Sequence, residues 1–372
     1  MNHHRPHIIL MGGFLGAGKT AAMIALAHWL DDQGIRAGFI TNDQGENLVD
    51  TRLMRACGFT TEEIPGGCFC CRFDDLVDAT KRLRATMRPD VLVAEAVGSC
   101  TDLAATVTYP WRRLFSDDCT VAPLSVLVDP IRAQRAFGLE PGATFSANVQ
   151  YIYQKQLEEA DLIVVTKCEL LEVSDLSALR EQLAEEFPLA EIHAVSSRRG
   201  IGLDAWFRRI VFGQQVPRAA MTVDYDRYAA GEAQLGWLNA TAAVRSATPV
   251  DGNLLLERLT GDLQQRLAAE ASQIAHLKMT LATASGVGTI NLARNDIVAE
   301  LGVTLSDPVA EAELVVNLRA EGAPARLEAA LRDAIRSATL ESGAPIELIH
   351  VEAFRPGRPE PTHRDGVTPP ST

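Results

Sequence analysis

The chain has 372 residues, of which 47% are hydrophobic and 22% are charged, values typical of a globular protein with core material for two domains. Its formal net charge of −13 argues against a nucleic-acid-binding protein, which would carry a basic surface. No apolar run is long enough to span a membrane, and the first strand begins too early for a signal peptide. The seven cysteines are odd in number and clustered, unlike a disulfide framework, so we expect a cytoplasmic protein.

The first part of the chain alternates apolar strands with helical patterns. A helix is expected from Lys19 to Asp32, because apolar residues recur at helical spacing and Gly34 follows the last turn. Continuous apolar runs predict buried strands of a parallel sheet. These runs are residues 8–11, 37–41, 91–95, 124–129, 162–166 and 192–196. The alternation predicts a doubly wound, mostly parallel α/β domain over residues 1–212.

A polar connector, residues 213–235, leads to a second region that mixes strands and helices. The strands are expected at residues 236–241, 272–281, 289–293, 314–318 and 346–354, and the helices at 253–270 and 325–340. This order predicts a smaller two-layer α+β domain over residues 236–354. Residues 355–372 are rich in Pro, Gly and charged side chains, so we expect a disordered tail there.

Residues 13–20 read Gly-Phe-Leu-Gly-Ala-Gly-Lys-Thr, the pattern of a P-loop that binds the phosphates of a nucleotide. Lys19 would reach the β- and γ-phosphates, and the Thr20 hydroxyl would ligate Mg²⁺. A glycine-rich turn arising by chance is disfavoured, because a strand precedes the motif and a helix follows it. The backbone that would surround the phosphates belongs to Gly13, Gly16, Ala17 and Gly18.

Three further positions are typical of the surroundings of a P-loop. Glu95 ends a strand of four apolar residues, where a carboxylate could meet Mg²⁺ through water, and Gly98 follows in a loop that could sense the γ-phosphate. Asp43 ends the strand after the P-loop helix and could orient the attacking water. A solvated strand end for Glu95 and an ordinary turn residue for Asp43 are the alternatives.

Residues 166–169, Thr-Lys-Cys-Glu, follow a predicted strand. They indicate which base of the nucleotide the protein binds. Proteins that recognise guanine carry the tetrapeptide Asn/Thr-Lys-x-Asp after the corresponding strand. The lysine stem packs on the ring, and the carboxylate accepts hydrogen bonds from guanine. Ser196 follows the last predicted strand, where a second base-contacting loop is usual. We therefore favour guanine over adenine, with contacts from Thr166, Lys167, Glu169 and Ser196.

Three cysteines follow a pair of glycines in the sequence Gly66-Gly67-Cys68-Phe69-Cys70-Cys71. Thiolates so close together could bind one Zn²⁺ or Cu(I) with a fourth donor from elsewhere, and Glu63 is the candidate for that donor. A disulfide between adjacent cysteines would be strained, and a Gly-rich polar loop is a poor place for core cysteines. The remaining cysteines are isolated in the sequence and typical of packing residues; they are Cys57, Cys100, Cys119 and Cys168.

Together these motifs make residues 7–212 resemble the CobW-type metallochaperone GTPases, relatives of the urease and hydrogenase nickel-insertion GTPases. The motifs are residues 12–20, residues 63–71 with Cys-x-Cys-Cys, the Glu95…Gly98 pair and residues 166–169. The resemblance implies slow GTP hydrolysis with Mg²⁺, zinc or a related transition metal on the three cysteines, and delivery of that metal to a client protein. It also implies a capacity to form homodimers.

The chain departs from that family at two places. Thr166 and Glu169 stand where the family usually has Asn and Asp, which bears on the preference for GTP. The C-terminal region lacks the family's basic, Gly-containing closing motif, which bears on the client.

The cysteine loop lies in sequence between the strands that end at Asp43 and Glu95. We therefore expect metal and γ-phosphate to act on the same loops. Two other functions are compatible with the motifs, namely a P-loop kinase for a small molecule and a nucleotide-dependent regulatory switch with little turnover.

Overall fold

The computed structural model describes residues 5–44 and 49–366. The chain forms two compact units. The first takes in the chain as far as Ala229 and again from Pro359 onward, and the second is Ala230–Arg358. In sequence, the second unit is therefore an insertion into the first. The division falls within helix α9 (Tyr225–Gln234), inside the stretch expected to be a polar connector.

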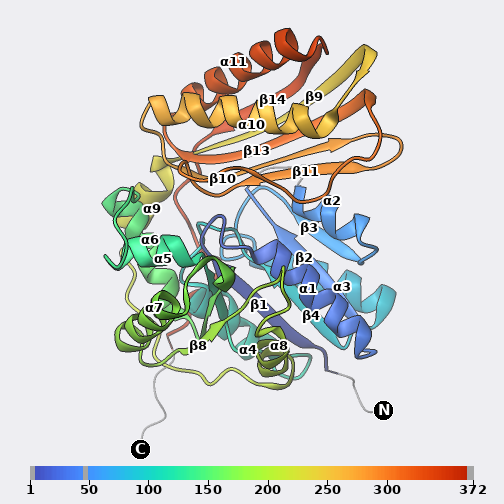
Figure 1. Ribbon diagram of the computed structural model, residues 1–372. Coiled ribbons are helices and arrows are strands. Elements are labelled where there is room, and N and C mark those ends of the chain that lie inside the picture. The colour runs from blue at the N-terminus through green and yellow to red at the C-terminus, as the bar shows by residue number, and fades with distance from the viewer. Residues whose placement is uncertain (1–4, 45–48, 367–372) are drawn as a thin grey trace, which may run out of the picture. The chain divides into compact units, whose positions relative to one another are not determined.

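In the described part of the first unit, eight strands form one sheet in which every pairing is parallel, with the order β3-β2-β4-β1-β6-β7-β8 and β5 beside β1 (Figure 1). The strands are β1 (His7–Gly13), β2 (Ala37–Asn42), β3 (Thr61–Ile64), β4 (Val91–Glu95), β5 (Thr120–Val121), β6 (Ser125–Val128), β7 (Leu162–Val165) and β8 (Glu191–Ala194). The apolar runs of the inner strands are buried because helices cover both faces of the sheet, whereas the residues of the edge strand β8 are at least partly exposed.

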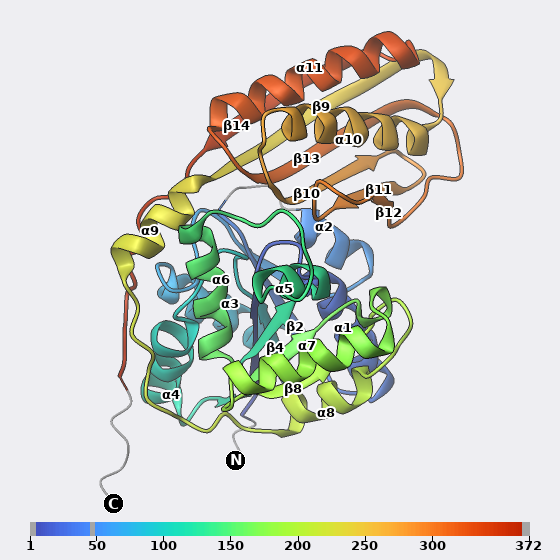
Figure 2. The same ribbon diagram turned by 60° about the vertical axis from the view of Figure 1, so that its left-hand side comes forward.

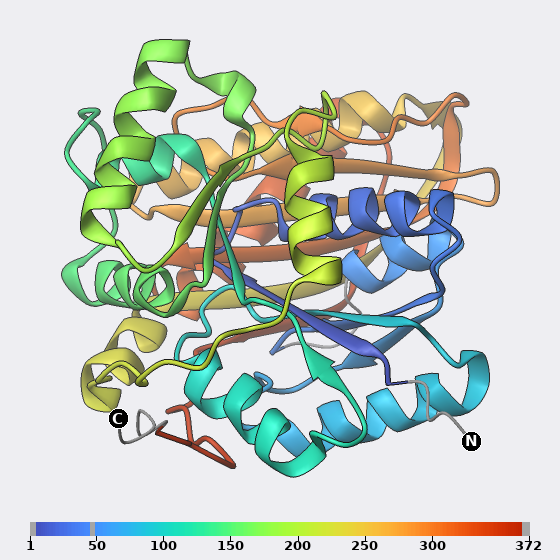
Figure 3. The ribbon, with the colours of Figure 1, turned by 90° about the horizontal axis from the view of Figure 1, so that it is seen from below.

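The helices of this unit are α1 (Lys19–Asp32), α2 (Val49–Ala56), α3 (Phe73–Met87), α4 (Tyr109–Phe115), α5 (Pro130–Ala136), α6 (Ala147–Glu159), α7 (Val173–Glu186) and α8 (Leu203–Phe212), with the short turns η1 (Ala104–Thr108) and η2 (Cys168–Leu170). Helices α1 and α8 lie on one face of the sheet, and α3 and α4 lie on the other (Figure 3). This arrangement confirms the predicted doubly wound α/β fold.

The core under α1 and α8 is apolar and closely packed. Phe59 packs against His28 and Phe39, with ring centroids 5.1 and 5.5 Å away. Trp206 of α8 is fully buried, and its indole Nε1 donates a hydrogen bond of 3.0 Å to the hydroxyl of Ser125 on β6. A buried indole N–H needs such a partner.

The second unit has a six-stranded antiparallel sheet in its described residues, in the order β12-β11-β10-β13-β9-β14. Helices α10 and α11 cover one face of it (Figure 2), as expected for a two-layer α+β fold. Its elements are β9 (Leu235–Val250), α10 (Gly252–Ala269), β10 (Ile274–Ala282), β11 (Val287–Leu292), β12 (Glu300–Leu301), β13 (Val309–Glu321), α11 (Pro324–Ser342) and β14 (Ile346–Phe354).

The end of the chain differs from the expected disordered tail. Residues 359–366 belong to the first unit and make backbone and side-chain hydrogen bonds with it, so the prediction is wrong for this segment. Residues 367–372 lie outside the described residues. Among the helices that the structure does describe, none combines the length and the apolar character needed to cross a bilayer.

We predict that Ser125→Ala lowers the free energy of unfolding of the first unit by about 1–3 kcal/mol, because the buried Trp206 N–H loses its acceptor. Urea unfolding followed by tryptophan fluorescence measures the change as a lower midpoint. Ser177→Ala, on the exposed surface of α7, is the matched control and should leave the midpoint in place. Equal midpoints for the two variants would contradict a contribution from the Trp206–Ser125 bond.

Candidate nucleotide and metal site

The candidate site lies at the carboxyl edge of the parallel sheet. The P-loop follows β1, and the loops after β2, β3 and β4 leave the sheet at the same edge, because these four strands are adjacent and parallel. In open α/β sheets ligands bind at this edge. Strand β3 was not predicted from the sequence, and it is the element that carries the chain to the cysteine loop.

The P-loop has the backbone of a phosphate cradle. Gly16 and Gly18 have φ values of 76° and 83°, a left-handed conformation that favours glycine. Lys19 is buried, and its Nζ donates to the carbonyl oxygens of Gly13 (2.9 Å) and Phe14 (3.3 Å). The ammonium group is thus held within the loop, at the start of helix α1.

Thr20 and Glu95 form a pair beside the P-loop. The Thr20 hydroxyl donates to Glu95 Oε1 at 3.2 Å, and both residues are buried. Glu95 ends β4 opposite Met11 of β1, which brings the carboxylate to the phosphate side. A hydroxyl and a carboxylate are the oxygen ligands that Mg²⁺ prefers, so these residues fit the metal of a nucleotide complex.

Gly98 lies against the P-loop. A Cβ at this position would come 2.9 Å from Leu15 N and 2.7 Å from its Cδ2, so no larger residue fits without a shift of the P-loop. The amide of Gln156, on α6, donates to the carbonyl oxygens of Gly98 (2.9 Å) and Cys100 (2.7 Å). The loop after β4 is therefore held between the P-loop and α6.

The first two residues of the predicted base motif, Thr166 and Lys167, form hydrogen bonds with the P-loop. The Thr166 hydroxyl donates to the carbonyl oxygen of Ala17 at 2.8 Å. Lys167 Nζ donates to Gly16 O at 3.0 Å and pairs with Asp129 at 2.9 Å. The Thr166 hydroxyl thus links the loop after β7 to the P-loop.

Glu169 lies on η2, and its Oε2 is buried without a hydrogen-bond partner among the described residues. A buried acceptor of this kind fits a ligand that donates N–H groups, as guanine does. Ser196 is buried, and its Oγ accepts from Arg199 N at 3.0 Å. The backbone N–H of Cys168 donates to Val195 O at 3.1 Å, which brings the two base-side loops together.

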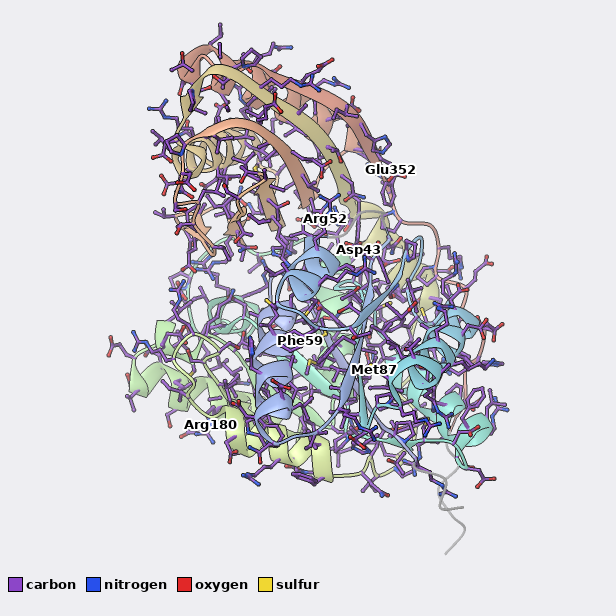
Figure 4. The ribbon with its side chains drawn as sticks, turned by 90° about the vertical axis from the view of Figure 1, so that its right-hand side faces the viewer. Asp43, Arg52, Phe59, Met87, Arg180 and Glu352 are labelled. Carbon is purple, nitrogen blue, oxygen red and sulfur yellow. The ribbon has the colours of Figure 1, made fainter. Side chains whose placement is uncertain are left out.

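Asp43 and Asn42 come at the end of β2. The Asp43 carboxylate accepts from Gln44 N at 2.6 Å, and the residue lies away from Phe59 and Met87, which mark the opposite end of the sheet (Figure 4). The role of Asp43 in orienting water stays a prediction. Residues 45–48, which follow it, lie outside the described residues.

Asn42 anchors the cysteine loop, a role that was not predicted from the sequence. Its Nδ2 donates to Ile64 O (2.8 Å) and Gly67 O (2.6 Å), and its Oδ1 accepts from Phe69 N (3.1 Å). Because Asn42 is buried at the last position of β2, the loop is fixed directly to a central strand. An asparagine at the end of an apolar strand is the only sequence signal of this function.

The three predicted cysteines do converge. Their sulfur atoms lie within 4.8 Å of one another, with Sγ–Sγ distances of 2.7 Å for Cys68–Cys70, 3.5 Å for Cys68–Cys71 and 3.7 Å for Cys70–Cys71. Sulfurs at the corners of a tetrahedron around zinc are about 3.8 Å apart. Two separations are therefore close to those of a zinc site, and the third would widen by about 1 Å on binding.

A fourth sulfur lies in the same cluster. The fully buried Cys100 is in hydrogen-bonding contact with Cys68 and Cys70. The contacts with Cys100, then Cys70 and Cys71, lower the pKa of the Cys68 thiol well below its usual value. Contacts with Cys100 and Cys68 raise the pKa of the Cys70 thiol. The contact with Cys68 raises the pKa of the Cys71 thiol to about 11.

Cys100 was expected to be an isolated packing residue, and the structure does not support that interpretation. Glu63, which was expected to supply an oxygen donor, lies half-buried on β3 and is not in the group of converging ligand atoms that the described residues form. The role of Glu63 as an oxygen donor stays a prediction.

Residues from the end of the chain cover the cysteine loop. The backbone N–H of Glu360 donates to Cys71 Sγ at 3.3 Å. Thr362 N donates to Cys70 O at 2.8 Å, and the Thr362 hydroxyl donates to Cys71 O at 3.3 Å. Cys71 is the most exposed of the three loop cysteines, so this segment lies at the open side of the cluster.

The same segment also holds the chain beyond Cys100. Arg364 Nε donates to the buried Asp102 at 2.7 Å, and Asp365 N donates to Ala105 O at 2.8 Å. Arg113 pairs with Asp365 at 2.7 Å. Composition gave no indication of these contacts, because Pro-rich and charged sequence is typical of a disordered tail.

Curated relatives of this chain include proteins named as zinc chaperones. CobW from Pseudomonas aeruginosa is 27% identical over 217 residues, which are 52% of this chain and 56% of that protein. CobW from Sinorhizobium sp is 29% identical over 196 residues, 46% and 53% of the two chains. YeiR from Escherichia coli is 30% identical over 167 residues, 42% and 45% of the two. The chain thus matches about half the length of these curated relatives.

Solved structures with a similar chain include HypB from Helicobacter pylori in complex with nickel, at 17% identity and a TM-score of 0.43 over 58% of this chain and 92% of that one. The Zn(II)-bound YjiA GTPase from E. coli aligns at 16% identity and a TM-score of 0.36, over 90% and 99% of the two chains. The family described as the CobW/HypB/UreG nucleotide-binding domain matches residues 7–194. Since that match covers just over half of the chain, this protein belongs to the CobW/HypB/UreG family.

Proposed function

We propose that this protein is a GTP-hydrolysing metal chaperone, which binds Zn²⁺ or a related thiophilic transition metal and delivers it to a client metalloprotein. The observation that carries the proposal is the convergence of Cys68, Cys70 and Cys71 at the sheet edge that also bears the P-loop. Thiolates select zinc and copper, and the zinc chaperones among the relatives support zinc. We place the protein in the cytoplasm, where thiols stay reduced, and propose a homodimer as its working form.

The residues around the P-loop support slow, Mg²⁺-dependent hydrolysis. Lys19 would exchange its carbonyl partners for the β- and γ-phosphates, and Thr20 with Glu95 would hold Mg²⁺, which neutralises charge on the phosphates. Asp43 would orient the attacking water. Gly98 lies close enough to the P-loop to respond when a γ-phosphate arrives. Thr166, Lys167, Glu169 and Ser196 would select guanine.

Nucleotide and metal would act on each other through two short connections. Asn42 links β2 to the cysteine loop, and the loop after β4 contacts both the P-loop and the cysteine cluster. Coupling between two sites typically amounts to about 1–3 kcal/mol and is reciprocal. GTP should therefore favour metal binding, and hydrolysis should favour release.

We predict that the protein binds Zn²⁺ roughly 5–150-fold more tightly with a non-hydrolysable GTP analogue than with GDP, the range that such coupling allows. Competition with a chromophoric chelator measures the affinities. Changing Cys68, Cys70 and Cys71 together to Ser should abolish Zn²⁺ binding, because hydroxyls are poor zinc ligands. Cys57→Ser, an exposed cysteine outside the cluster, is the control.

Phosphate release with and without Zn²⁺ separates the proposal from the two other functions. A metal chaperone should release phosphate at a rate that changes when Zn²⁺ is added. The triple cysteine variant should not show this change. A small-molecule kinase would transfer phosphate only to an added acceptor and would ignore the cysteines. A regulatory switch would bind GTP in stoichiometric amounts with little release. Equal Zn²⁺ affinity in all nucleotide states, with unchanged turnover, would refute the chaperone.

We predict that Glu169→Ala lowers the ratio of GTP to ATP affinity at least tenfold, because hydrogen bonds to a charged acceptor contribute about 1.5–3 kcal/mol each. Titration with fluorescent GTP and ATP analogues measures the ratio. Glu172→Ala is the control, since Glu172 is exposed and its side chain makes no cap hydrogen bond to α7. An unchanged ratio for Glu169→Ala would show that the motif does not read the base.

A further inference from the structure

Residues 359–366 lie across the open side of the cysteine cluster, and we call them the cover segment. Buried or half-buried side chains alternate with exposed ones along it, the pattern of an extended chain with one face on the protein. The His363 ring packs edge-on against Phe73, the first residue of α3, with ring centroids 5.0 Å apart. The cover segment is therefore docked along its length. Its buried or half-buried members are Pro359, Pro361, His363 and Asp365.

Three hydrogen bonds join the cover segment to the cysteine loop, and one of them ends on a sulfur. Glu360 N donates to Cys71 Sγ at 3.3 Å. The backbone N–H and the hydroxyl of Thr362 donate to the carbonyl oxygens of Cys70 and Cys71. A group that hydrogen-bonds to a metal ligand orients that ligand, and its loss typically lowers metal affinity about 10–100-fold. The Glu360 N–H is placed to act in this way on Cys71.

The cover segment is anchored away from the sulfurs. Arg364 Nε donates to Asp102 at 2.7 Å, and Arg364 Nη2 donates to Met221 O at 2.8 Å. The Asp102 side chain is 1% exposed, so loss of its cationic partner leaves a buried charge, which is unfavourable. The pair between Asp365 and Arg113 is partly exposed, and such pairs contribute little. One firm anchor and several weaker contacts thus keep the segment closed at rest.

Cys71 is the sulfur that the cover segment can control. Cys68 and Cys70 are buried, whereas Cys71 is partly exposed, and its sulfur accepts the hydrogen bond from Glu360. An acceptor that takes the metal must replace the cysteine sulfurs one at a time by its own ligands. The exposed side of the cluster, at Cys71, is where that replacement begins.

We propose that the cover segment is part of the metal site and holds the cargo metal until an acceptor takes it. This inference rests on the proposed function. In the closed position the Glu360 N–H stabilises the Cys71 thiolate, and residues 360–362 occupy the side from which an acceptor ligand would arrive. When the segment lifts, the bond from Cys71 to the metal is exchanged for a bond to an acceptor ligand. The released thiolate takes a proton from water, and the metal keeps its oxidation state.

Paired substitutions at Glu360 test the role of its N–H. Glu360→Pro removes the N–H and keeps the chain extended, because a residue before proline is already confined to extended conformations that proline also adopts. Glu360→Ala keeps the N–H and is the matched control, since the Glu360 side chain is exposed. With a non-hydrolysable GTP analogue, we expect Zn²⁺ release to excess chelator to be about 10–100-fold faster from Glu360→Pro and unchanged in Glu360→Ala. Equal rates for the two variants would overturn the proposal.

Arg364→Gln tests the anchor in the metal-free protein. Without the pair to Asp102 the segment should lift more often, so iodoacetamide should modify Cys71 about tenfold faster or more, the factor typical for loss of a hydrogen bond to a charged group. Peptide mass spectrometry measures the rate. Arg355→Gln, an exposed arginine outside the cover segment, is the control. Modification of Cys71 at the wild-type rate in Arg364→Gln would contradict the anchoring of the cover.

The outcomes separate this inference from the function on which it rests. If Glu360→Pro and Arg364→Gln release Zn²⁺ at the wild-type rate while the triple cysteine variant binds none, the chaperone stands and the role of the cover segment is refuted. If the wild-type protein binds no Zn²⁺, both are refuted. Retained GTP binding in the two variants verifies that the P-loop remains intact.

Discussion

The close approach of Gly98 to the backbone of Leu15 is the constraint on which the site depends. A glycine at this point allows the loop after β4 to touch the P-loop. The same loop then reaches the cysteine cluster, because Cys100 follows within two residues. A larger side chain at this position would push the loop after β4 away from the P-loop.

The parallel sheet supplies the setting for this contact. With β4 between β1 and β2, and β3 at the edge, four loops with different chemistry leave the sheet at the same edge. The loop after β1 cradles phosphate, the loop after β4 follows Glu95 and reaches Cys100, the loop after β2 begins with Asp43, and the loop after β3 carries Cys68. Each loop starts from a strand of the same sheet, so the sheet fixes where these loops begin.

Much of the fold could be predicted, and the reasons are visible in particular elements. Helix α1 and strand β4 have the bounds expected from their apolar patterns, because long-range packing agrees with local preference there. The P-loop and the Cys-x-Cys-Cys loop could be read as contiguous motifs, and the three sulfurs do converge. Strand β3 escaped prediction because its four residues include two glutamates.

Contacts between distant parts of the chain could not be predicted. Nothing in the sequence pairs Cys100 with Cys68, since a single cysteine has no periodicity or spacing to reveal its partners. Asn42 was overlooked for the same reason. Thr362 bonds to the cysteine loop through its backbone N–H as well as its hydroxyl. Backbone pairing leaves no trace in composition, and this is why the segment was expected to be disordered.

The position of residues 359–366 has a consequence for biosynthesis. These residues close over the cysteine loop only after the chain has passed through the whole inserted second unit. During translation most of the first unit leaves the ribosome before residues 359–366 have been synthesised. A nascent chain that has not yet reached residue 360 therefore lacks the backbone N–H that donates to Cys71 Sγ in the folded protein.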